Sequence, residues 1–329
     1  MTSKTKGYAA MALLAVQFGL QPILYQQFAA QAKYTSVLVI VCEWCKLLVA
    51  FAALLSSGEA LQVWKTWSFK QSLAASGLPA CSYAVQNVLV QIAYQHLPPI
   101  VFNLINQTKL LWTALFVHLL IGKRFSFQQC GAMLVLLSAA VLLSLAKGTT
   151  KATHDSSGPS MEPLSVERGL LPVIAASVLS GFGGAVTQRS MQLHQRKTAL
   201  VTMELSFYGM LFLTTPAMYS LLFVSDYGLS SLVFSTSQWF SLFQGWDVFT
   251  LIPVLSNALG GLLVGAVTKY VGGVLKSFAL VVGIALTAVV ESWLTNTALP
   301  VDVWVAAALV TLSMFVYNAY PYEEKPKTT

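Results

Sequence analysis

The stretch FNLINQTKLLWTALFVHLLIG, residues 102–122, is apolar and long enough to cross a membrane, yet a lysine stands near its middle. A charge at that depth costs about 3 kcal/mol or more, so Lys109 is a candidate functional residue. Other side chains able to contact a ligand share its helix face at helical spacing: Phe102, Asn106 and Thr113. We expect this face to line a cavity rather than to meet lipid.

The composition of the whole chain is typical of a polytopic membrane protein. Of the 329 residues, 56% are hydrophobic and 9% are charged, and the mean hydropathy is +0.68. Soluble domains carry about 25% charged residues. We predict an all-α protein with ten transmembrane helices, because ten stretches can each cross about 30 Å of hydrocarbon: residues 8–29, 34–56, 71–95, 98–121, 125–146, 169–194, 198–224, 248–270, 273–295 and 299–318.

The distribution of Lys and Arg predicts how these helices are oriented. Cationic residues collect in the short loops on the cytosolic side of a membrane. If both termini are cytosolic, ten of the loop and tail cations lie on that side and four lie on the opposite side. The net charge of +7 therefore reflects membrane topology and does not indicate a nucleic-acid partner.

A hydrophilic segment rich in Ser, Thr, Gly and Pro, residues 147–168, divides the chain near its midpoint. We interpret it as a lumenal linker between a first five-helix repeat, residues 1–146, and a second, residues 169–318. Residues 319–329 then form a cytosolic tail. Because five is odd, the second repeat enters the membrane in the opposite orientation, which is the arrangement of inverted-repeat transporters.

Each predicted repeat contains a pair of helix-breaking residues between two apolar spans. The first repeat has Pro98 and Pro99, and the second has Gly272 and Gly273 at the corresponding place. Such pairs point to the substrate site and the hinges of transporters, although they also make ordinary tight turns. Their correspondence favours a hinge or gating role for all four residues.

Several charged residues within the spans can neutralise one another. Lys46 follows Glu43 by three residues, so the two can pair along one helix face. Arg189 and Glu204 come from neighbouring spans and can pair similarly, unless Arg189 extends to the cytosolic surface. If both pairs form, the interior charges that remain are mainly positive: Lys109, Lys269 and Lys276 against Glu291. This excess predicts an anionic ligand.

Amides and an aromatic ring follow the third span at a spacing of three to four residues: Tyr83, Gln86, Asn87 and Gln91. Side chains of this kind suit a base or a sugar, so the ligand is expected to be nucleotide-like, although polar stripes also hold helices together.

The sequence lacks the motifs of enzymes and of resident cofactors. It contains no Walker A loop, no G-x-G-x-x-G loop and no H-E-x-x-H arrangement, so we expect neither catalysis nor a cofactor. Cys42 and Cys45 form a C-x-x-C pair inside a span, which we interpret as packing residues rather than as a metal site.

Several of these segments resemble the nucleotide-sugar transporter family of the drug/metabolite transporter superfamily, most closely its CMP-sialic acid branch. The resemblance is carried by CEWCKLL, YAVQN, VFNLINQTKLLWTAL, SGFGG and GGLLVGAVTKYVGGVLKSF. It implies ten helices with both ends in the cytosol and residence in the Golgi or endoplasmic reticulum. It also implies exchange of a cytosolic nucleotide sugar for a lumenal nucleoside monophosphate.

The resemblance also implies a substrate site. Lys109 and Lys269 match lysines that bind phosphate and acid groups, and Tyr83 and Asn87 match members of the nucleotide pocket. Further positions fall on or beside the same cavity: Lys46, Phe102, Ser206 and Lys276. Asn106, from the polar helix face, and Tyr270, from the Lys269-Tyr270 segment, complete the expected binding set.

Two departures from the sialic-acid branch concern the sugar. Phe102 and Asn106 stand where that branch usually has tyrosines, and Gln188-Arg189 stands where it usually has Glu-Lys. We predict an antiporter in the Golgi membrane that exchanges CMP-sialic acid, or a related CMP-sugar, for CMP. Two alternatives from the same fold are a UDP-sugar/UMP exchanger and a proton-coupled exporter that uses Glu43 or Glu204. A third alternative is a receptor that transports no substrate. The sequence is also compatible with a homodimer.

Overall fold

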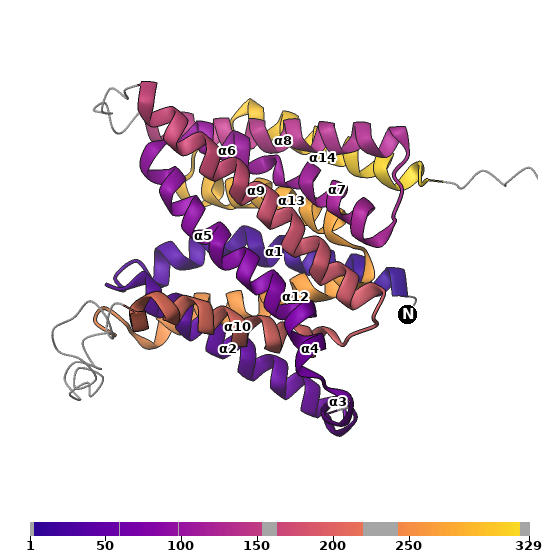
Figure 1. The fold of residues 1–329 in the computed structure, drawn as a ribbon. Coiled ribbons are helices and arrows are strands. Elements are labelled where there is room, and N and C mark those ends of the chain that lie inside the picture. Colours follow the sequence, from indigo (N-terminus) through magenta and orange to yellow (C-terminus); the bar gives the residue numbers. More distant parts are fainter. Residues whose placement is uncertain (1–2, 59, 98, 153–162, 220–242, 323–329) are drawn as a thin grey trace, which may run out of the picture.

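The computed structural model describes residues 3–58, 60–97, 99–152, 163–219 and 243–322, and these residues form helices joined by short connections (Figure 1). The helices of the first half are α1 (Ser3–Phe28), α2 (Thr35–Ser56), α3 (Ala60–Thr66), α4 (Phe69–Ser72), the π-helix η1 (Leu73–Gly77), α5 (Leu78–His96), α6 (Pro99–Gln107), α7 (Lys109–Ile121) and α8 (Phe127–Ala152). The second half contains α9 (Pro163–Gln192), α10 (Thr198–Tyr219), the 3-10 helix η4 (Val248–Thr250), α12 (Leu251–Tyr270), α13 (Gly273–Thr295) and α14 (Val301–Ala319).

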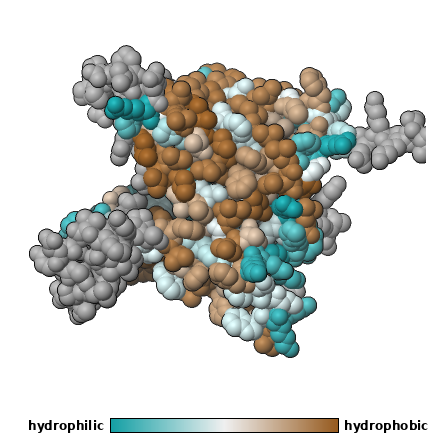
Figure 2. Space-filling view, viewed as in Figure 1, coloured by the Kyte–Doolittle hydropathy of each residue, from teal (hydrophilic) through white to brown (hydrophobic). Residues whose placement is uncertain are grey.

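Within the described part of the chain, nine helices are long and apolar enough to cross a membrane, and Thr198–Thr214 is a shorter apolar helix. The chain is therefore a multi-pass membrane protein. The predicted span 198–224 runs past the described residues, so the count of ten stays a prediction. Figure 2 shows hydrophobic side chains over most of the viewed face, whereas hydrophilic ones gather near α3 and α4.

Within the predicted span 98–121, Leu104–Ile121 is long and apolar enough to cross a membrane. The helix is interrupted for one residue, Thr108, between α6 and α7, and Thr108 keeps helical backbone angles while its hydroxyl donates to the carbonyl of Ile105 at 2.6 Å. Lys109 directly follows this interruption. Pro98, one of the expected hinge residues, lies outside the described residues.

Helices of one half pack mainly on helices of the other half. Helix α1 packs on α12 and α13, and α9 packs on α5 and α7. Helix α8 lies beside α14, and α2 lies beside α10 (Figure 1). The helices of the two halves can be matched in chain order: α1 with α9, α2 with α10, α5 with α12, α7 with α13 and α8 with α14. Exchanging each helix for its match leaves this set of packing partners unchanged. The largest buried apolar cluster lies between the halves and includes Leu14, Leu136 and Phe278.

The start of α12 is held by the loop that precedes it. The backbone N–H of Thr250 donates to Asp247 at 2.8 Å, and the Thr250 hydroxyl donates to the carbonyl of Phe28 at 3.0 Å. The bonds from Thr250 hold the pKa of the Asp247 carboxyl below its usual value. The end of α1 and the start of α12 are thereby joined.

The turn between α12 and α13 is tied to α9 by two glutamines. Gln192 donates through Nε2 to the carbonyls of Thr268 and Lys269 at 3.0 and 3.1 Å. Gln188 donates to Gln192 at 2.8 Å and accepts from the backbone N–H of Gly273 at 2.8 Å. These contacts satisfy backbone carbonyls at the end of α12 and a backbone N–H at the start of α13, which have no partner within their own helices.

We expect Gly272→Ala to lower the thermal stability of the protein. Gly272 has φ +96° and ψ 170°, a region almost restricted to glycine that costs other residues about 1–3 kcal/mol, and a Cβ there would stand 2.9 Å from Nε2 of Gln188. Gly122, which has left-handed helical angles and nothing within 4 Å of a built Cβ, is a control for a positive φ without a steric contact. The measurement is the midpoint of thermal unfolding. If Gly272→Ala cost no more than Gly122→Ala, the contact with Gln188 would be unimportant.

Candidate functional site

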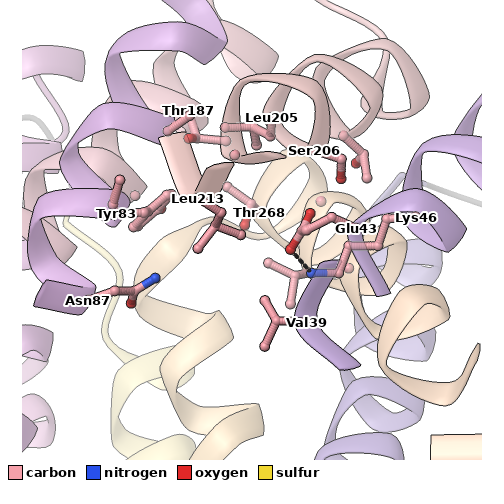
Figure 3. A pocket seen from close by; sticks show the side chains of 18 of the residues that line it. Val39, Glu43, Lys46, Tyr83, Asn87, Thr187, Leu205, Ser206, Leu213 and Thr268 are labelled. Atoms are coloured by element: carbon pink, nitrogen blue, oxygen red, sulfur yellow. Dashed lines mark hydrogen bonds and ion pairs between the residues drawn. The ribbon is translucent and has the colours of Figure 1, made fainter. Parts of the chain in front are cut away.

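A cavity of about 390 Å³ lies between the two halves (Figure 3). Five long helices and the start of α13 supply its walls. Its polar and charged lining consists of Glu43 and Lys46 from α2, Tyr83 and Asn87 from α5, Thr187 from α9, Thr202 and Ser206 from α10, Thr268 from α12 and Lys276 from α13. Five of the ten predicted substrate-binding residues therefore meet here: Lys46, Tyr83, Asn87, Ser206 and Lys276.

One wall carries an ion pair. Nζ of Lys46 lies 2.8 Å from Oε1 of Glu43, which confirms the predicted pairing. Both side chains keep about a fifth of their surface exposed, so the pair faces the cavity. A Cβ at Gly261 would stand 3.2 Å from the Lys46 side chain, and this glycine therefore gives the lysine room.

The opposite wall, formed by α5, presents Tyr83 and Asn87 (Figure 3). A Cβ at Gly183 would stand 3.1 Å from the Tyr83 ring, so the absence of a side chain lets α9 approach this ring closely. The glycine-rich segment of α9 thus both packs on α5 and positions a ring at the cavity. An aromatic ring beside an amide is suited to a flat ligand with hydrogen-bonding edges.

Lys276 reaches the cavity from the first turn of α13. Its Nζ lies 4.0 Å from the position that a Cβ of Gly184 would occupy. Among the described residues, no carboxylate lies within ion-pair distance of this ammonium group. An unpaired ammonium group away from bulk water is costly, and it favours an anionic ligand.

Lys109 lies in a different and smaller cavity of about 60 Å³, which also receives Gln107 and Ser277. The two ammonium groups of Lys109 and Lys276 interact electrostatically. Of the predicted helix face, only Lys109 lines this cavity, whereas Phe102, Asn106 and Thr113 line neither it nor the central cavity, so the expectation that the whole face lines a cavity is wrong. A role of Lys109 in binding phosphate stays a prediction.

The remaining predicted binding residues lie away from the central cavity. Phe102 is 1% exposed and packs in an apolar cluster with Leu97 and Val173. Asn106 does not line the cavity. Lys269 donates to the carbonyl of Arg196 at 3.4 Å. Tyr270 is 37% exposed at the end of α12.

Of the two possibilities for Arg189, the pairing with Glu204 does not form, and Arg189 is exposed instead. Glu204 is 5% exposed and accepts from Arg196 at 2.7 Å, from Trp67 at 2.9 Å and from Ser76 at 2.7 Å. Arg196 follows α9 in the connection to α10, and this connection folds back over the carboxylate. Glu204 thus joins α10 to η1, to the α3–α4 connection and to the α9–α10 connection.

The sequence prediction did not include the other polar lining residues Glu43, Thr187, Thr202 and Thr268 among the binding residues. For Glu43 the signal was present, because a residue three positions before Lys46 shares its helix face. The threonines carried no such signal, because a threonine in an apolar helix usually donates to its own backbone. Thr187 does so, donating to the carbonyl of Gly183 at 2.8 Å.

A bundle of membrane-crossing helices around a cavity with charged and polar lining residues is an arrangement found in transporters. The chain belongs to the nucleotide-sugar transporter family, whose model matches residues 2–318. The protein is accordingly a transporter rather than an enzyme.

Among similar proteins, the UDP-N-acetylglucosamine transporter ROCK1 of Arabidopsis thaliana is 36% identical over 315 residues, covering 96% of this chain and 92% of its own. The UDP-N-acetylglucosamine transporter of Rattus norvegicus is 28% identical, over 76% of this chain and 71% of its own. A crystal structure with 16% sequence identity has the same fold, with a TM-score of 0.63 over 96% of each chain.

These relatives correct the sequence-based preference for the CMP-sialic acid branch. Their names refer to UDP-sugars, which fits the alternative better than the main prediction. The preference for CMP came from the motif resemblance alone. The excess of lysines could not decide between the two, because a CMP-sugar and a UDP-sugar carry similar negative charge.

Proposed function

We propose that the protein exchanges a UDP-sugar, of the UDP-N-acetylglucosamine class, for UMP across the Golgi membrane. The observation that carries this proposal is the central cavity, whose lining contains Lys276 without an acidic partner among the described residues. The similarity to UDP-N-acetylglucosamine transporters supports the choice of base and sugar.

The charges of the central cavity suit a nucleoside diphosphate group. Glu43 already balances Lys46, whereas Lys276 and the nearby Lys109 add positive charge without an ion pair in the described structure. A diphosphate placed beside Lys276 supplies the missing negative charge. Tyr83 and Asn87 on the far wall then remain for the uracil ring or the sugar.

The arrangement of the two halves supports alternating access. Lys109 follows the one-residue interruption at Thr108, and Lys276 stands in the first turn of α13. The exchangeable packing of the two halves supports the inverted repeats predicted from the sequence. We place the hinges at the two pairs of helix-breaking residues, Pro98-Pro99 and Gly272-Gly273.

The charge distribution supports an orientation with both described ends of the bundle in the cytosol. The segments on the same side of the bundle as the start of α1 and the end of α14 are rich in cations (Figure 1): Lys65 in α3, Lys70 in α4, Lys123 and Arg124 between α7 and α8, and Arg196 and Lys197 between α9 and α10. Ser126 donates to the carbonyl of Tyr320 at 2.6 Å, which places the α7–α8 connection at the end of α14. Cationic connections are cytosolic by the usual bias.

The lysine without an ion pair, Lys276, explains why export of UMP is coupled to import of the UDP-sugar. When the carrier crosses empty, Lys276 has no counter-ion in a closed cavity, so the barrier is high. A bound nucleotide supplies that counter-ion and lowers the barrier. Export of UMP therefore drives import of the UDP-sugar.

The test is counterflow in proteoliposomes loaded with UMP. We expect uptake of labelled UMP, inhibited by external UDP-N-acetylglucosamine and not by CMP-sialic acid at the same concentration. A pH gradient should not change the rate of uptake, and this result distinguishes a nucleotide exchanger from a proton-coupled exporter. Inhibition by CMP-sialic acid alone would restore the CMP assignment, and no uptake with any nucleoside monophosphate would overturn the exchange.

A further inference from the structure

A third cavity, of about 620 Å³, lies where α9 ends, between α9, α7 and the α4–η1 segment. It shares no residue with the central cavity. Its polar lining consists of Gln71, Arg189, Ser190, His194 and Arg196. Its apolar lining includes Leu78, Leu120 and Phe182. We call it the α9-end cavity.

The α9-end cavity has a positive charge that the described residues do not balance. No acidic side chain lines it. Arg196 is occupied, since it binds Glu204 at 2.7 Å and donates to the carbonyl of Gln71 at 3.4 Å. Arg189, in contrast, forms no ion pair within the described structure. The guanidinium group of Arg189 is thus available to an anion.

A buried hydroxyl without a partner adjoins this charge. Ser190 is 2% exposed, and its Oγ forms no hydrogen bond in the part of the chain that the structure describes. Buried polar atoms are nearly always satisfied, and those that are not require an explanation. A ligand oxygen in the cavity would satisfy this hydroxyl and meet Arg189 at the same time.

Polar and apolar lining residues are arranged in order along α9. Phe182 and Val186 precede Arg189 by two turns and one turn, and so lie deeper in the bundle. Phe182 is held edge-on against Phe116, with ring centroids 5.5 Å apart. The cationic end adjoins Arg196 and Lys197 in the α9–α10 connection. The cavity is therefore charged at the membrane surface and apolar beneath it.

We propose that the α9-end cavity binds an anionic glycerophospholipid. Its phosphate contacts Arg189 and the Ser190 hydroxyl, and one acyl chain lies along Phe182 and Leu120. Cationic cavities between membrane helices on the cytoplasmic side suit anionic headgroups. A soluble phosphate would leave the apolar part unused, so the lipid fits the whole cavity better. This assignment rests on the predicted cytosolic position of this end of the protein.

The test measures thermal unfolding of the purified protein in detergent micelles with added phosphatidylinositol. We expect phosphatidylinositol to raise the unfolding midpoint and phosphatidylcholine not to. Arg189→Gln should weaken the apparent affinity by about fivefold or more, because a cation near a headgroup contributes about 1 kcal/mol. Arg168→Gln is the matched control, since it removes the same charge from the exposed opposite end of α9.

Three results would overturn the proposal. An equal response to phosphatidylcholine, or an unchanged response in Arg189→Gln, would exclude recognition of the headgroup. An equal response to water-soluble glycerophosphoinositol would show a site for free anions rather than for lipid. Retained stabilisation of Arg189→Gln by UMP shows that the variant is folded. If UMP fails to stabilise the parent as well, the proposed function fails while the lipid response still tests this site.

Discussion

Replacing Lys276 with methionine should abolish most nucleotide exchange and yet stabilise the empty protein. The ammonium group faces the central cavity with no acidic partner among the described residues. A hydrogen bond to a charged group contributes about 1.5–3 kcal/mol, so counterflow of UMP should fall by at least about tenfold. Methionine has a similar length without the charge, which relieves the desolvation penalty in the empty state.

Two measurements separate loss of binding from loss of folding. In the absence of nucleotide, the unfolding midpoint of Lys276→Met should rise by about 2 °C or more, and the further rise caused by UMP should vanish. Lys70→Met, which removes an exposed lysine from α4, should change neither quantity. Exchange at the parental rate in Lys276→Met would show that this lysine does not contact the substrate.

Glu204→Ala should lower the free energy of unfolding more than any other substitution proposed for this protein. The carboxylate accepts from Arg196, Trp67 and Ser76, and all three donors lose their acceptor in the variant. Removing one partner of a buried ion pair costs about 3–5 kcal/mol, since the remaining charge stays buried without compensation. We expect a lower unfolding midpoint, with UMP still able to raise it, because Glu204 does not line the central cavity.

The control variants test the ion pair itself. Glu291→Ala removes an acid of α13 that forms no ion pair within the described residues, and it should change stability little. In the double variant Arg196→Met/Glu204→Met no charge is left without a partner, so part of the loss should be recovered. If Glu204→Ala were as stable as Glu291→Ala, the carboxylate would not hold these segments together.

The features predicted correctly from the sequence are local ones. Hydropathy located the spans, because lipid contact selects apolar residues regardless of tertiary structure. The Glu43–Lys46 pair followed from helical spacing, since both residues lie on one helix. Tyr83 and Asn87 were likewise placed together by a spacing of four residues.

The features that were missed depend on how helices cross. Arg196 reaches Glu204 only because the α9–α10 connection folds back, and no spacing rule predicts this geometry. Phe102 was expected beside Lys109 from helical spacing, but it packs into an apolar cluster with Leu97 and Val173. Which of the faces of a helix meets the cavity depends on its neighbours and not on its own spacing.

The exchanged packing of the two halves has a consequence for biogenesis. Helix α1 packs on α12 and α13, which are synthesised late, and α9 packs on helices synthesised before it. Helix α1 therefore remains in the bilayer without these packing partners until nearly the whole chain has been synthesised. Truncation after α10 leaves that surface of α1 uncovered, so a shortened chain should be recognised as incomplete and degraded. Neither half is expected to form its native packing when it is produced alone.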